Sequence, residues 1–77
     1  MRQLPEHLTA ETWVRQIFAS REAMQGGVVK RKIRDVERLC GRALFLGEVE
    51  RRGFQVVQNR RHFVIFCNSD PIRRVRE

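Results

Sequence analysis

The pattern of apolar positions predicts an amphipathic helix in the first third of the sequence. Apolar residues recur at the spacing of one helical face: Trp13, Val14, Ile17 and Phe18. Thr9 stands just before this run, where an N-cap residue is expected. Gly26 and Gly27 follow it, and glycine readily adopts the left-handed conformation that ends helices. The spacing therefore predicts a helix over residues 10–24.

A second apolar pattern, between Asp35 and Gly53, predicts another helix but places apolar residues on two faces. One face gathers Val36, Leu39, Cys40, Ala43 and Leu46. Phe45 and Val49 fall on roughly the opposite side of the same helical wheel. Either the chain breaks near Gly41 into two shorter helices, or one helix is covered on both faces, which would favour a dimer.

Gly53 is expected to end this helix, and Phe54 is placed to make the hydrophobic contact of a Schellman cap. After Gly53 the pattern changes to that of β-strands. Residues 54–58 and 62–67 predict the two strands of a hairpin, and residues 59–61 predict its loop. The second strand is apolar on both faces, with Val64 and Phe66 on one of them, so we expect both faces to be covered. The interval from Val28 to Ile33 is ambiguous: we expect extended or irregular structure, and a short edge strand and the start of a helix both remain open.

These elements together predict an α+β fold in a single small domain over residues 1–77. It has an N-terminal helix, a second helix that either continues or breaks near Gly41, and a C-terminal antiparallel β-hairpin. We expect a homodimer, because a chain this short covers only one face of its sheet. The candidate interface residues are Phe45, Val49, Val64 and Phe66. Residues 1–8 and 73–77 are expected to be disordered ends.

The charge is unevenly distributed along the chain. Lys and Arg number 16 against 9 Asp and Glu, a formal net charge of +7, and all of the excess lies after residue 27. The basic residues gather in four clusters, at Lys30 to Arg34, Arg51 and Arg52, Arg60 and Arg61, and Arg73 to Arg76. Clusters of this kind are typical of proteins that bind polyanions, because Lys and Arg that neutralise phosphates release condensed counterions. We therefore expect a non-catalytic protein that binds nucleic acid, either DNA or RNA. The expected phosphate contacts are Lys30, Arg31, Lys32, Arg51, Arg52, Arg60, Arg61, Arg73 and Arg74.

Two other interpretations of the same residues remain open. In the first, the protein is an interaction module or obligate homodimer, and its arginines meet an acidic protein partner. In the second, the segments on either side of Gly41 form a helix-turn-helix with Arg42, Arg51 and Arg52 facing outward. Glu48 and Glu50 count against the second interpretation, because they would face phosphates.

The sequence offers little support for catalysis or metal binding. It contains no Gly-rich phosphate loop, HExxH motif or CxxC pair. His62 and Cys67 are five positions apart on one predicted strand, so they point to opposite faces and cannot share one ion. We expect no cofactor, no metal and no small-molecule substrate, and we expect Cys40 and Cys67 to be reduced thiols.

The run from Glu48 to Val64 resembles part of the HicA-type mRNA interferases, in which a helix ends in Gly-Phe and a hairpin then carries a histidine. Gly53, Phe54 and His62 are the matching positions. Arg60 and Arg61 stand where that family has a small Gly-Ser pair. The resemblance covers about a fifth of the chain and implies, as a third alternative, a small ribonuclease that uses His62.

No apolar run approaches the roughly 18 residues that a membrane-spanning helix needs. Residues 1–7 lack the apolar stretch of a secretory signal. We therefore expect a cytoplasmic protein without a membrane partner.

Overall fold

The computed structural model describes residues 9–75. Residues 1–8 and 76–77, which belong to the ends expected to be disordered, lie outside the described residues. Residues 73–75 are exposed and belong to no helix or strand.

The first predicted helix is present but ends early. Helix α1 (Ala10–Phe18) begins as expected at Thr9, whose side-chain oxygen accepts a hydrogen bond from the Thr12 N–H at 3.2 Å. Ser20 interrupts the helix, because its hydroxyl accepts from the Ala23 N–H and so caps a separate short helix, α2 (Arg21–Met24). The prediction of one helix over residues 10–24 is therefore wrong at residues 19–20, where the chain divides into two helices.

The segment whose structure was ambiguous forms strand β1 (Val28–Lys32), at one edge of the sheet. Helix α3 (Ile33–Leu39) follows it directly, and helix α4 (Arg42–Arg51) comes after a two-residue turn. Gly41 in that turn has a φ of +87°, a conformation that favours glycine.

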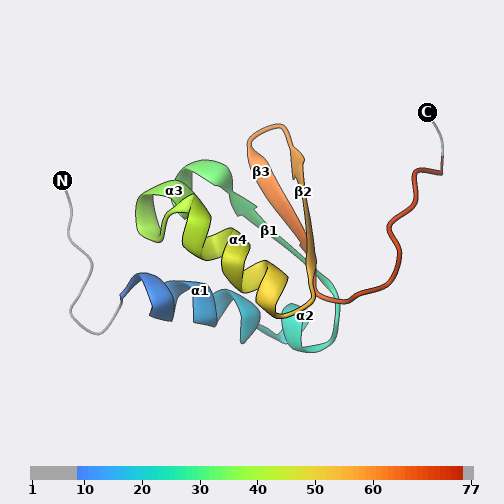
Figure 1. The fold of residues 1–77 in the computed structure, drawn as a ribbon, viewed down its shortest axis with the longest axis horizontal. Helices are drawn as coiled ribbons and strands as arrows, with labels where there is room; N and C mark the ends of the chain where they lie inside the picture. Colours follow the sequence, from blue (N-terminus) through green and yellow to red (C-terminus); the bar gives the residue numbers. More distant parts are fainter. Residues whose placement is uncertain (1–8, 76–77) are drawn as a thin grey trace.

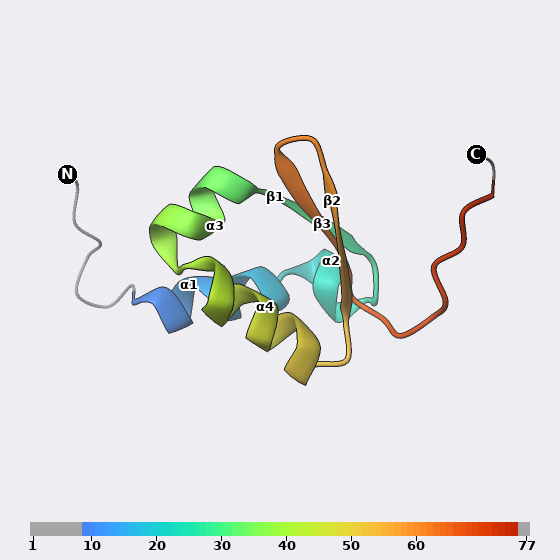
Figure 2. The same cartoon turned by 45° about the horizontal axis from the view of Figure 1, so that its top comes forward.

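The break at Gly41 explains the apolar pattern with two faces. Val36 of α3 and both Phe45 and Val49 of α4 point into the same core, because the two helices run in different directions (Figure 2). Phe45 is 0% exposed and Val49 is 3% exposed. Their prediction as interface residues is therefore wrong: both are covered within one protomer.

Helix α4 ends in the predicted Schellman cap. Gly53 has a φ of +73°, and the Phe54 N–H donates to the Val49 carbonyl at 3.0 Å. The hairpin then follows as β2 (Gln55–Asn59) and β3 (His62–Phe66), joined by the loop Arg60–Arg61.

The sheet has three strands and not the two that were predicted. Its order is β1-β3-β2, and both pairings are antiparallel. The last strand in the sequence therefore lies in the centre, between β2 and the distant β1. Lys32 pairs with His62 near the hairpin loop, and Val28 pairs with Phe66 at the other end.

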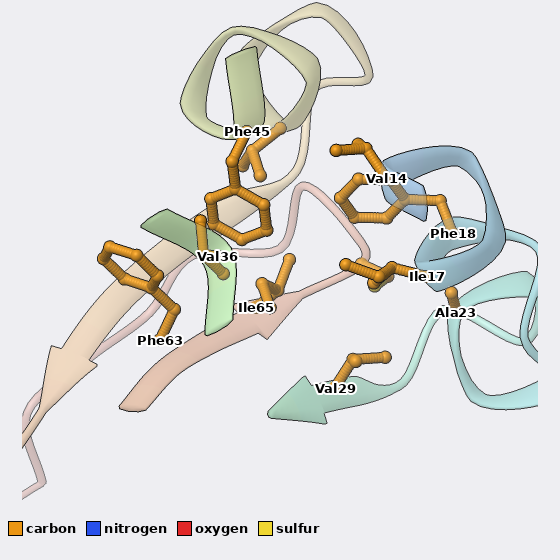
Figure 3. Packing of buried hydrophobic residues seen from close by; sticks show 11 residues of the cluster. Val14, Ile17, Phe18, Ala23, Val29, Val36, Phe45, Phe63 and Ile65 are labelled. Carbon is orange, nitrogen blue, oxygen red and sulfur yellow. The ribbon is translucent and has the colours of Figure 1, made fainter. Parts of the chain in front are cut away.

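The core lies between one face of this sheet and the helices α1 and α4 (Figures 1 and 3). Phe45 stacks on Phe63 of the sheet at 5.2 Å and on Phe18 of α1 at 6.5 Å, measured between ring centroids. Val29 and Ile65 close the core from β1 and β3. Phe45 of α4 thus contacts both α1 and the sheet.

The other face of the sheet carries the side chains that alternate with the buried ones. They are Val28, Lys30 and Lys32 of β1, Gln55, Val57 and Asn59 of β2, and His62, Val64 and Phe66 of β3. Within residues 9–75 no helix packs over this open face, so the expectation that both faces are covered is not met in one protomer.

Candidate nucleic-acid interface

The loop of the hairpin projects two arginines from the end of the sheet. Arg60 and Arg61 are both exposed, and Arg60 has a φ of +55°. A residue with a Cβ is uncommon in this left-handed region, where hairpin loops usually place glycine or asparagine. The loop therefore holds an arginine in a conformation that costs stability, which is a reason to look for a role for its side chain.

The basic residues of β1 lie beside this loop, because β1 pairs with β3. Lys32 is directly opposite His62, and the Ile33 N–H donates to the Arg61 carbonyl at 2.9 Å. Lys30 lies one step further along the same open face. Two of the predicted clusters, far apart in the sequence, thus meet at one end of the sheet.

Arg34, in the first turn of α3, extends the same group. It is exposed and lines a hollow together with Lys32 and Arg61. The hairpin-end cluster, as defined here, comprises Lys30, Lys32, Arg34, Arg60 and Arg61. The predicted contact residues did not include Arg34, although its place in the basic run that starts at Lys30 could have suggested it.

Arg31 lies on the same strand but points differently. Its position alternates with Lys30 and Lys32, so its side chain lies on the helix side of the sheet. Its Nη1 donates to the Lys30 carbonyl at 2.7 Å. It borders the hairpin-end cluster without sharing its open face.

The arginines that follow Arg34, in α3, in α4 and at the end of α4, differ from the hairpin-end cluster in having carboxylate neighbours. Arg38 lies 3.5 Å from Asp35, and Arg42 lies 3.3 Å from Glu37. Glu48 receives both Arg51 at 2.7 Å and Arg52 at 3.4 Å. For the cations of the hairpin-end cluster, residues 9–75 supply no carboxylate within 4.0 Å. Other cations of residues 9–75 also lack such a partner, namely Arg15, Arg21, Arg31, Arg73 and Arg74. What distinguishes the hairpin-end cluster is that five such cations gather near one loop.

Arg52 is built into the packing. Its guanidinium carbon lies 4.8 Å from the centre of the Phe18 ring, and its Nε is buried without a hydrogen-bond partner. Arg51, by contrast, has a side chain that is 66% exposed. The hydrogen bond from Arg51 is the main cause that lowers the pKa of Glu48 below its ordinary value.

Arg73 and Arg74 belong to the C-terminal segment, which leaves the sheet at the end of β3 opposite the hairpin loop (Figure 1). The side-chain nitrogen of Gln55 donates to the carbonyls of Asn68 and Asp70, which guides the C-terminal segment away from that end (Figure 1). The four predicted basic clusters therefore do not form one patch. Two meet at the loop, and the other two lie elsewhere.

The outward face of α4 carries small residues. Ala43, Gly47 and Glu50 are exposed, while the guanidinium of Arg42 lies 5.2 Å from the centre of the Phe63 ring. A tight turn joins helices α3 and α4, and the hairpin follows them in the sequence.

The described residues include His62 and both cysteines, the side chains considered above for catalysis or metal binding. His62 is half-buried at the start of β3, beside Arg61. Cys40 and Cys67 are free, and burial raises the pKa of both thiols. Among residues 9–75, no three His, Cys, Asp or Glu side chains are grouped closely enough to hold a metal ion.

Neither a family model nor a curated protein nor a solved structure matches this chain. None of the helices between residues 9 and 75 combines the length and apolar character needed to cross a bilayer.

Proposed function

We propose that this protein binds nucleic acid without catalysing a reaction, and that the hairpin-end cluster supplies its main phosphate contacts. The observation that supports the proposal is the meeting of cations without carboxylate partners around one loop. Lys and Arg side chains in this state pay no cost for breaking an ion pair when they bind phosphate. Arg31, Arg51, Arg52, Arg73 and Arg74 are outside this cluster and are proposed only as peripheral contacts.

Duplex DNA is the form that the fold favours. Two helices joined by a tight turn and followed by a hairpin make an arrangement of the winged helix-turn-helix kind. In helix-turn-helix proteins the second helix enters the major groove. Ala43 and Gly47 on the outward face of α4 would allow close approach to the groove. Glu50 on the same face would repel a phosphate, so the arrangement requires it to meet the amino group of a cytosine. This support is an analogy of fold, since many unrelated functions share one architecture.

Salt-dependent binding of a labelled duplex tests the proposal. Fluorescence anisotropy from about 50 to about 200 mM salt should give a linear fall of the logarithm of the affinity with the logarithm of the salt concentration. In the double variant Arg60→Ala/Arg61→Ala, the magnitude of that slope should fall by about two. The variant Arg73→Ala/Arg74→Ala changes the charge equally and should alter the slope less. Equal changes in both variants, or no binding at low salt, would reject the proposal.

A second candidate function, as a homodimeric interaction module, is favoured by the open face of the sheet. Val28 is 49% exposed and Val57 is 40% exposed, on either side of the half-buried Val64 and Phe66. An antiparallel arrangement of two such faces would place the lysines of the two copies at opposite ends. Sedimentation should then show a dimer at micromolar concentration that Val57→Lys dissociates. A monomer throughout that range would reject it.

A further inference from the structure

A hollow lies at the end of the sheet, between helix α3 and the hairpin loop. Its volume is about 660 Å³, which is in the range of sites for small ligands. Its lining residues are Lys32, Ile33, Arg34, Asp35, Glu37, Arg38, Arg61 and His62. Figure 2 shows α3 and the hairpin loop as the two projecting parts of this end of the fold. We call this hollow the loop cleft.

Backbone bonds fix the walls of the loop cleft. The Ile33 N–H donates to the Arg61 carbonyl at 2.9 Å, and Lys32 pairs with His62 across the two strands. The start of α3 therefore cannot move away from the loop without breaking the end of the sheet. A ligand would meet a site that exists before it binds, which reduces the entropy lost on binding.

The charges around the loop cleft favour an anion. Four of its lining residues are Lys or Arg, against two carboxylates. Both carboxylates are already engaged, since Asp35 lies 3.5 Å from Arg38 and Glu37 lies 3.3 Å from Arg42. Lys32, Arg34 and Arg61 have no carboxylate partner within residues 9–75 and line the same space.

We propose that the loop cleft binds a phosphate-bearing ligand of nucleotide size. Arginine forks suit the paired oxygens of a phosphate group. Ile33 and the aliphatic stems of the arginines offer apolar surface to the remainder of the ligand. Lys32 and His62 lie on the open face of the sheet, away from α4. The site is thus distinct from the groove-facing surface proposed for α4, but it shares Lys32, Arg34 and Arg61 with the hairpin-end cluster.

The same phosphate chemistry has two sources, a free nucleotide or one phosphate of a nucleic-acid strand. Nuclear magnetic resonance titrations of the whole chain distinguish them, with ADP, adenosine, inorganic phosphate and a short single-stranded oligonucleotide as probes. We expect ADP to shift the amide signals of Lys32, Ile33, Arg34, Arg61 and His62 in a saturable way at physiological salt. Adenosine should not do so. Stronger saturation by the oligonucleotide than by ADP would assign the site to a strand phosphate.

Two exposed arginines provide a matched pair of variants. Arg34→Gln should weaken ADP binding at least about tenfold, because it removes a charge-assisted contact. Arg73→Gln makes the same charge change far from the loop cleft and should leave binding within about twofold. Glu37→Gln should strengthen binding, an effect that a merely structural residue would not produce.

The proposal is overturned if ADP shifts signals near every arginine equally, if adenosine acts like ADP, or if Arg34→Gln and Arg73→Gln weaken binding equally. Duplex binding is measured separately by anisotropy, so loss of the nucleic-acid proposal and loss of the loop-cleft proposal give different results. Saturable ADP binding with no duplex binding would reject the nucleic-acid proposal and leave the loop-cleft proposal standing.

Discussion

The hairpin end and the α3–α4 helices use the same residue type in opposite ways. At the hairpin end, Arg60 and Arg61 project into solvent from a strained loop. In α4, Arg52 lies over the Phe18 ring and near Glu48, where its charge is neutralised and its stem is packed. Density of arginine in the sequence therefore does not locate a binding surface. The neighbours that the fold supplies decide which cations remain free.

The largest expected effect concerns the helical side of this comparison. Phe45→Ala would leave a cavity between Phe18 and Phe63, the two rings on which Phe45 stacks. We expect a loss of about 3–5 kcal/mol in the free energy of unfolding, measured by urea denaturation. Substitution of the exposed Arg61 by Ala is the control and should change stability by less than about 0.5 kcal/mol. A comparable loss of unfolding free energy in both variants would show that Arg61 contributes to stability as much as Phe45 does, and would contradict the comparison.

The turn between the two helices gives the next largest effect. Gly41→Ala places a Cβ at a φ of +87°, although no atom lies within 4 Å of it. The cost is then conformational, and we expect a loss of about 1 kcal/mol. Gly47→Ala, within α4 and equally free of neighbours, should instead be neutral or stabilising by up to about 1 kcal/mol. Equal effects at both glycines would contradict the importance of the turn.

Single arginine substitutions compare the two regions directly. Arg52→Ala should lose about 1 kcal/mol of stability through its contact with Phe18. Arg60→Gly should gain about 0.5 kcal/mol, because it relieves the positive φ, while it weakens binding to the duplex. Thermal melts measure these opposite changes in stability, and anisotropy measures duplex binding by both variants. Loss of stability in Arg60→Gly would show that the loop is not strained.

The smallest expected effect is a dependence on pH at Glu48. Its pKa is lowered in the folded state, chiefly by the hydrogen bond from Arg51, so it stabilises the fold above the pKa of the unfolded chain. That contribution should disappear as the pH falls below about 4.3 and through the lower folded value. Denaturation curves of Glu48→Gln should therefore differ from the parent at neutral pH and converge with it in acid. High salt should reduce the difference, because the pair is at the surface.

Local patterns were enough to predict most of the elements of this fold. The caps at Thr9 and Gly53 were predicted correctly, because neighbouring residues determine them. The two predicted strands after Gly53 are present, but they belong to a three-stranded sheet and not to an isolated hairpin. The two-faced apolar pattern left a break or a dimer open, and only the folded chain showed that Gly41 makes the break. Ser20 was overlooked as a helix-interrupting cap.

The sequence left a short edge strand open as one alternative for Val28 to Ile33, but it could not show the pairing of that strand with β3 or the meeting of the basic clusters. Strand β1 buries Val29 and carries Lys30 and Lys32 on its open face, so its apolar alternation is weak. Its partner β3 follows some thirty residues later, and no local signal specifies that pairing. That pairing brings Lys32 to the hairpin loop, so the position of the hairpin-end cluster could not be predicted without it.

The order of strands also has a consequence for how the chain is made. Strand β3 is the last of the three to be synthesised and occupies the centre of the sheet, so β1 has no partner in the sheet until β3 exists. The sheet then closes through contacts between residues far apart in the chain, a feature associated with slow folding. During synthesis the lysines of β1, which disfavour unwanted edge pairing, would protect a strand that must wait for its partner.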